Sequence, residues 1–108
     1  MITADQIKQG FQLAEQASVS MYDQMGRKDA YACGFAWVDV YVDRTNSKQA
    51  KELIAAGFRK DYKPKCLSFW NPGGLPVQNI DIKEAGAEAM ATFLRSLGLT
   101  AYAGSRLD

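Results

Sequence analysis

The sequence predicts an α+β protein in the ferredoxin-like split βαβ order, in which a four-stranded antiparallel sheet carries two helices on one face. Three observations lead to this prediction. The 108 residues, 47% of them hydrophobic, suit a single domain with its own core. Apolar residues recur at helical spacing in three segments and at strand spacing in four others. In chain order these segments are helix, strand, helix, strand, strand, helix and strand, and the last six match the split βαβ order.

The extra N-terminal helix is expected from Thr3 to about Tyr22. Thr3 and Gln6 have the spacing of a capping box, and Ile2 and Ile7 have the positions of a hydrophobic staple. We treat residues 1–25 as a helix appended to an α+β core of residues 26–108, within one domain. Its apolar stripe consists of Ile7, Phe11, Ala14, Ser18 and Met21.

The strongest strand signal lies between Ala32 and Val42. Valine and alanine alternate with larger residues, so both faces of this strand are largely apolar and we expect it to be central. Two helices cover only one face of such a sheet, whereas Phe35, Trp37 and Tyr41 lie on the other. We therefore expect the first helix, a second subunit or both to cover that face, and we predict a homodimer or higher oligomer.

A second helix is expected to begin near Asn46, with Gln49 in its first turn, and to end at Gly57 in a left-handed cap. A strand then follows from Lys65 to Trp70. Asn71-Pro72-Gly73-Gly74 is typical of a tight turn, so we expect a hairpin that leads into a weaker strand from about Leu75 to Ile80.

The last helix is expected to begin at Asp81, because Asp81 and Glu84 form a second capping-box pair. Gly98 should end it, with Leu99 in the Schellman position against Leu94. A short strand from Thr100 to about Ala103 completes the sheet, and the residues beyond it are expected to be a flexible tail.

Composition excludes several kinds of chemistry. The sequence contains no histidine, which removes Ser-His-Asp and Cys-His catalysis and His-ligated zinc. Cys33 and Cys66 lack CxxC spacing and lie in apolar contexts, so we expect two buried thiols in a reducing cytosol, with a disulfide or a reactive thiol as the alternative. The 71–74 turn lacks the Gly-Lys-Ser/Thr of a phosphate loop. We expect no cofactor and no catalytic residue.

Charge and the N-terminal residues bear on location and partners. Thirteen basic against twelve acidic residues give a net charge of +1, which provides no global attraction to nucleic acid or to a membrane. The first residues lack the basic and long apolar regions of a signal peptide, and no apolar run approaches transmembrane length. We expect an intracellular protein without a membrane partner.

Two strings give a resemblance to known proteins. Residues 33–38 (CGFAWV) and 101–108 (AYAGSRLD), with the 70–74 turn region between them, resemble small uncharacterised accessory proteins encoded by tailed bacteriophages. The resemblance covers roughly residues 26–108 and leaves the first helix outside. It implies expression in the cytoplasm of an infected bacterium and an accessory role, and it transfers no residue function.

Asp39 is the first candidate site residue. A carboxylate between Trp37 and Tyr41 on a central strand must be desolvated, paired with a cation or directed at a ligand. One interpretation makes Asp39 and Asp43, four residues later on the same face, a metal site or general base. The other has Asp39 paired with an Arg or Lys, or exposed on the sheet.

A basic loop and the C-terminal tail are the other candidates. Residues 59–65 hold four basic residues against one acidic residue, which suits phosphate binding or a solvated loop. In the tail, Ser105 offers a hydroxyl and Arg106 a guanidinium. Trp70, just before the 71–74 turn, offers an aromatic recognition anchor. The predicted ligand-binding residues are Asp39, Trp37, Lys60, Tyr62, Lys63, Trp70, Ser105 and Arg106.

These features favour a non-enzymatic binding module for a host protein or a nucleotide-like ligand. The alternative is a nucleic-acid-binding module, in which sheet aromatics stack on bases and the basic loop contacts phosphates. A third interpretation is a metal-dependent enzyme built on Asp39 and Asp43.

Overall fold

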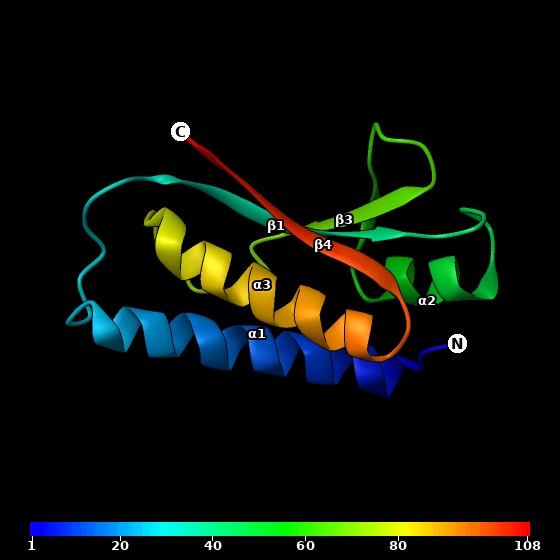
Figure 1. Ribbon diagram of the computed structural model, residues 1–108, viewed down its shortest axis with the longest axis horizontal. Helices are drawn as coiled ribbons and strands as arrows, with labels where there is room; N and C mark the ends of the chain where they lie inside the picture. Colours follow the sequence, from blue (N-terminus) through cyan, green and yellow to red (C-terminus); the bar gives the residue numbers. More distant parts are fainter.

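The computed structural model describes all residues from Met1 to Asp108 and contains three helices and one four-stranded antiparallel sheet (Figure 1). This confirms the predicted α+β class. None of the three helices combines the length and apolar character needed to cross a membrane. The elements are α1 (Ala4–Gln24), β1 (Gly34–Tyr41), α2 (Lys48–Ala55), β2 (Arg59–Lys60), β3 (Cys66–Trp70), α3 (Ile80–Ser96) and β4 (Thr100–Leu107).

The sheet has the strand order β2-β3-β1-β4, so β1 lies between β3 and β4. Trp37 lies opposite Trp70 on β3 and Gly104 on β4, which fixes the register on both sides of β1. Even-numbered residues of β1 point into the core, where Val38 and Val40 are fully buried. All three helices lie on this side of the sheet (Figure 1). The odd-numbered residues of β1 therefore occupy the opposite face.

Helix α1 packs along α3 on the core side, so the expectation that it covers the aromatic face is wrong (Figure 1). Small residues permit the close approach of the two helices. A Cβ at Gly86 of α3 would lie 2.5 Å from Ser18 Oγ, which itself donates to the Ile82 carbonyl at 2.8 Å. The apolar stripe of α1 fits the same core, with Ile7 and Ala14 fully buried. Cover by a second subunit stays a prediction.

The predicted hairpin at residues 71–74 is wrong. The antiparallel neighbour that precedes β3 is β2, and residues 75–79 form no strand, apart from an isolated bridge between Cys33 and Asn79. The turn instead directs the chain toward α3, because Gly73 is buried against Ser18 of α1 and leaves no room for a Cβ. The left-handed backbone of Gly74, with φ of 76°, completes the change of direction.

Two predicted helix starts shift by one or two residues. Asn79, not Asp81, caps α3, because its side-chain oxygen accepts from the Ile82 N–H at 3.1 Å. In the same way Ser47, not Asn46, caps α2.

Other predicted helix ends are confirmed. Thr3 and Gln6 form the capping box of α1. Gly57 follows α2 with φ of 111°. Gly98 follows α3 with φ of 95°, and the Leu99 N–H donates to the Leu94 carbonyl at 3.1 Å, as a Schellman motif requires.

Strand β4 is longer than predicted. It continues from Thr100 to Leu107, and residues 104–106 pair with β1 instead of forming a flexible tail. Arg106 lies opposite Phe35, so its position is set by the sheet. This extension brings the C-terminal residues to the aromatic face.

Candidate functional site

We call the sheet face opposite the helices the open face. No helix covers it, and β1, β3 and β4 supply its side chains at alternate positions (Figure 1). Its residues are Phe35, Trp37, Asp39, Tyr41, Cys66, Ser68, Trp70, Tyr102, Gly104 and Arg106.

An aromatic cluster occupies one end of the open face. The rings of Trp37 and Trp70 stack with centroids 4.8 Å apart and an interplanar angle of 25°. Phe35 joins them, 5.8 Å from the Trp70 ring. Trp70 is 48% exposed, so the cluster presents an indole to solvent. Exposed aromatic rings of this kind supply stacking or anchoring surfaces.

Two cations contact this aromatic cluster. The guanidinium carbon of Arg106 lies 5.3 Å from the Phe35 ring centroid and 5.8 Å from that of Trp70. Lys83, which is buried on α3, places Nζ 5.4 Å from the Phe35 ring and donates to the Gly34 carbonyl at 2.8 Å. Neither cation forms a salt bridge. This end of the open face thus carries positive charge without a carboxylate partner, as an anion-binding surface requires.

Asp39 is the centre of a hydrogen-bond network beside the cluster. Its carboxylate accepts from the Ser68 hydroxyl at 2.6 Å, from the Lys63 ammonium at 2.6 Å and from the Trp37 indole N–H at 3.3 Å. The side chain of Asp39 is only 8% exposed. The expectation that a Lys or Arg pairs with Asp39 is confirmed, and the partner is Lys63.

Lys63 lies between two carboxylates. Its ammonium is 2.6 Å from Asp39 Oδ2 and 3.5 Å from Asp61 Oδ2. The hydrogen bond to Asp39 raises the pKa of Lys63 above its ordinary value. Asp39, Asp61 and Cys66 hold ligand atoms within 4.8 Å of one another, but a metal ion there would have to displace the Lys63 ammonium. Asp43, which one interpretation placed with Asp39 in a metal site, does not belong to this group.

The two cysteines differ in exposure. Cys66 is buried on the open face, and its burial raises the pKa of its thiol. Cys33 is exposed just before β1, so the expectation that it is buried is wrong. Both thiols are free. Cys66 therefore contributes packing, and only Cys33 is open to reagents.

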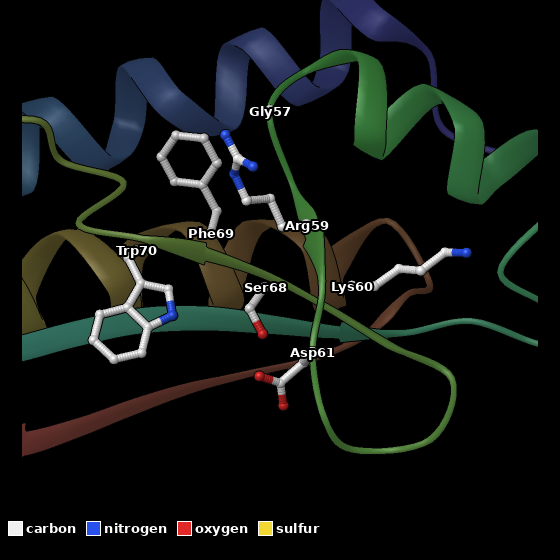
Figure 2. Close-up of a pocket in the computed structure, with 7 residues that line it drawn as sticks. All are labelled: Gly57, Arg59, Lys60, Asp61, Ser68, Phe69 and Trp70. Carbon is white, nitrogen blue, oxygen red and sulfur yellow. The ribbon is translucent and has the colours of Figure 1, made fainter.

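A hollow of about 520 Å³ lies beside Trp70, at the edge of the sheet (Figure 2). It forms where β2 begins at Arg59, so that Ser68 has a partner in Arg59 but Phe69 and Trp70 have none on that side. Arg59 and Lys60 both line the hollow, although Figure 2 shows both side chains directed away from the Trp70 indole, with the Arg59 guanidinium beside the Phe69 ring. Arg59 forms no salt bridge.

Five of the eight predicted site residues meet on or against the open face: Trp37, Asp39, Lys63, Trp70 and Arg106. Tyr62 is highly exposed, with the Lys63 ammonium 5.8 Å from its ring. Lys60 lines the hollow instead. Ser105 lies opposite Ala36, whose side chain is in the core, and thus points to the helix side of the sheet, away from Arg106.

Sequence reasoning did not identify two of the contacting residues. Ser68 donates to Asp39, and Lys83 reaches the open face from the first turns of α3. No sequence signal marks Lys83, because lysine is common on helices. Gly104 had a usable signal, since an isolated glycine in a strand often marks a close approach by another group.

Comparison of the chain with protein-family models, with curated proteins and with solved structures found no match. The functional argument therefore depends on the open face.

Proposed function

We propose that the protein is a non-enzymatic binding module whose open face takes a nucleotide-like ligand. The observation that carries the proposal is the contact of Arg106 with Phe35 and with the half-exposed Trp70, in the absence of a carboxylate partner. The Trp70 indole offers a surface on which a planar base stacks. The guanidinium beside it offers donors for a phosphate.

The surrounding charges support an anionic ligand over a neutral one. Lys83 adds a second cation next to Phe35, and its ammonium donates to the Gly34 carbonyl. Arg59 lines the hollow, but its guanidinium lies beside Phe69 and is directed away from the Trp70 indole (Figure 2). The two carboxylates nearby, Asp39 and Asp61, share the Lys63 ammonium and are therefore neutralised in part. A phosphate at the aromatic cluster would meet the Arg106 guanidinium, and Lys83 adds positive potential around Phe35.

We propose that residues 34–107 have the ferredoxin-like split βαβ topology. The strand order β2-β3-β1-β4 supports it, because β3 separates β1 from β2 and β1 separates β3 from β4. The antiparallel pairings make β1 parallel to β2, and β3 parallel to β4, as two interleaved βαβ units require.

We propose a phage-encoded accessory role in the cytoplasm of the infected bacterium. The likeness of residues 33–38 and 101–108 to strings in phage accessory proteins supports it. Native mass spectrometry of the protein purified from phage-infected cells tests both role and ligand. We expect a co-purifying nucleotide, whereas a co-purifying host protein would favour the alternative partner class.

Tryptophan fluorescence tests the ligand class directly, because both tryptophans of the chain belong to the aromatic cluster. Adenosine and uridine nucleotides should quench the emission on titration, with affinity that falls as salt is added. Nucleosides without phosphate should bind more weakly. Absence of quenching by any nucleotide at millimolar concentration would contradict the proposal.

Matched variants locate the site. Trp70→Ala should weaken binding about tenfold, the effect of losing one stacked base. Arg106→Gln should weaken binding and reduce its dependence on salt. The control is Arg44→Gln, an exposed arginine beyond the far end of β1 that contacts no part of the cluster. Equal effects of the two arginine variants would remove Arg106 from the site.

A single-stranded nucleic acid is the second candidate ligand. The observation that favours it is a second aromatic pair on the open face, Tyr41 and Tyr102, with centroids 6.4 Å apart. Two stacking positions along β1 would hold successive bases. A short oligonucleotide that binds at least tenfold more tightly than its mononucleotide, with a further loss in Tyr102→Ala, would favour this candidate.

A further inference from the structure

Strand β4 forms one edge of the sheet and leaves its outer side without a neighbouring strand. The direction of its backbone groups follows from β1. The Ala36 carbonyl accepts from Asn71, so even-numbered residues of β1 bond toward β3 and odd-numbered residues bond toward β4. The Asp108 N–H accordingly donates to the Cys33 carbonyl.

In β4 the even-numbered residues thus bond inward to β1, and the odd-numbered residues direct their N–H and C=O groups outward. Arg95 protects one end of this edge, since its guanidinium donates to the Ala101 carbonyl at 2.8 Å and lies 5.9 Å from the Tyr102 ring. Residues 103–107 have no such protection. They contain no proline and no lysine, the residues that commonly block edge strands.

We propose that a second copy of this chain pairs with this edge, antiparallel and centred on Ser105. Ser105 then faces Ser105 of the partner subunit, and Ala103 faces Leu107 of the partner subunit. This register uses all the outward groups of Ala103, Ser105 and Leu107 and leaves the Arg95 contact intact. The proposal is independent of the ligand on the open face.

Two features favour a second copy over another strand. Leu107 is 67% exposed and lies on the helix side of the sheet, where the register places it against Ala103 of the partner subunit. Arg106 faces Gly104 of the partner subunit, which has no side chain. The Arg106 side chains of the two copies therefore do not lie opposite each other, and no side chain across the strand pair obstructs them. The pairing is twofold symmetric, as in most homodimers. It joins both sheets, with the two open faces on the same side.

Light scattering and a proline variant test the proposal. We expect a particle of twice the 11.9 kDa of one chain. Ser105→Pro removes an outward N–H and no bond to β1, so it should give a monomer with an unchanged circular dichroism spectrum. Ser105→Ala is the matched control and should remain dimeric. A mass of 11.9 kDa for the wild type at every concentration would overturn the proposal.

Hydrogen exchange on the wild type tests the edge without any substitution. In the dimer the N–H groups of Ala103, Ser105 and Leu107 should exchange at least about tenfold more slowly than in the diluted monomer. Those of Gly104 and Arg106 should be protected in both. A dimer in which the odd-numbered amides of β4 stay unprotected would overturn the proposal. A dimer that dissociates in Trp70→Ala but persists in Ser105→Pro would place the interface on the open face and would overturn it as well.

Discussion

The indole of Trp37 covers the backbone of Gly104, its register partner on β4. A Cβ at residue 104 would lie 2.5 Å from Trp37 Nε1 and 2.6 Å from Cε2, closer than carbon atoms approach in proteins. The position of Trp37 therefore depends on the absence of a side chain across the strand pair. That position gives Trp37 both its stack on Trp70 and its hydrogen bond to Asp39.

Gly104→Ala should displace the Trp37 indole and lower the free energy of unfolding by about 1–3 kcal/mol, the usual cost of overpacking. Urea unfolding measures the stability, and near-ultraviolet circular dichroism reports the loss of the stacked tryptophan pair. Ser105→Ala, on the other side of the sheet, is the control and should change stability by less than about 0.5 kcal/mol. An unchanged tryptophan spectrum in Gly104→Ala would show that the ring does not need this space.

Asp39→Asn should destabilise the protein by about 1–2 kcal/mol, because it removes the charge that Lys63 pairs with. The loss is smaller than for a fully buried ion pair, since the Lys63 side chain is 30% exposed and its ammonium can turn to water. A double-mutant cycle with Lys63→Met isolates the pair. A coupling energy near zero would mean that the pair contributes nothing to stability.

On the alkaline side of neutrality, the Lys63–Asp39 pair should weaken only when the Lys63 ammonium loses its proton. The pKa of Lys63 is raised on folding, so the folded state holds this proton more tightly than the unfolded state does. The stabilisation is therefore complete below the ordinary lysine pKa of 10.5 and is lost as the pH rises above it. The difference in melting temperature between wild type and Lys63→Met should stay constant from pH 7 to about 10 and shrink beyond. A difference already halved at pH 9 would contradict this assignment.

The two thiols should react at different rates. Iodoacetamide at pH 8 should modify the exposed Cys33 and leave Cys66 unmodified, because Cys66 is buried and its thiol pKa is raised. Intact-mass spectrometry should show one adduct on the native protein and two after denaturation. The Cys33→Ser variant should show none in the native state. Rapid labelling of Cys66 in that variant would indicate that the open face unfolds locally.

Local signals in the sequence predicted one helix start and the helix C-terminal caps, whereas the starts of α2 and α3 shifted by one or two residues. The Thr3 and Gln6 capping box and the Gly98 and Leu99 Schellman motif each depend on residues a few positions apart. The turn after Trp70 was mispredicted because its direction depends on packing against Ser18, more than fifty residues away in the chain. Strand β2 has only two residues, both charged, so its pairing with β3 alone defines it as a strand.

Part of the open face could also be predicted, because it depends on a local pattern in the sequence. Trp37 and Asp39 alternate along a strongly patterned strand, so their shared face follows from the period of two. The identity of the cation that pairs with Asp39 depends on the path of the β2–β3 loop, which no local pattern determines. Lys83 reaches the site from a helix on the other side of the sheet, and only the packing of α3 places it there.

The alternation along β1 separates two kinds of evolutionary constraint on neighbouring positions. Val38 and Val40 are held by the core, whereas Phe35 and Trp37 contact other residues of the open face and cations beside it. Odd-numbered positions of β1 can thus be substituted while the fold persists, and under the proposed function such substitutions would change ligand preference. An insertion of one residue in β1 would exchange the two sets of side chains between the core and the open face, and both would be lost together.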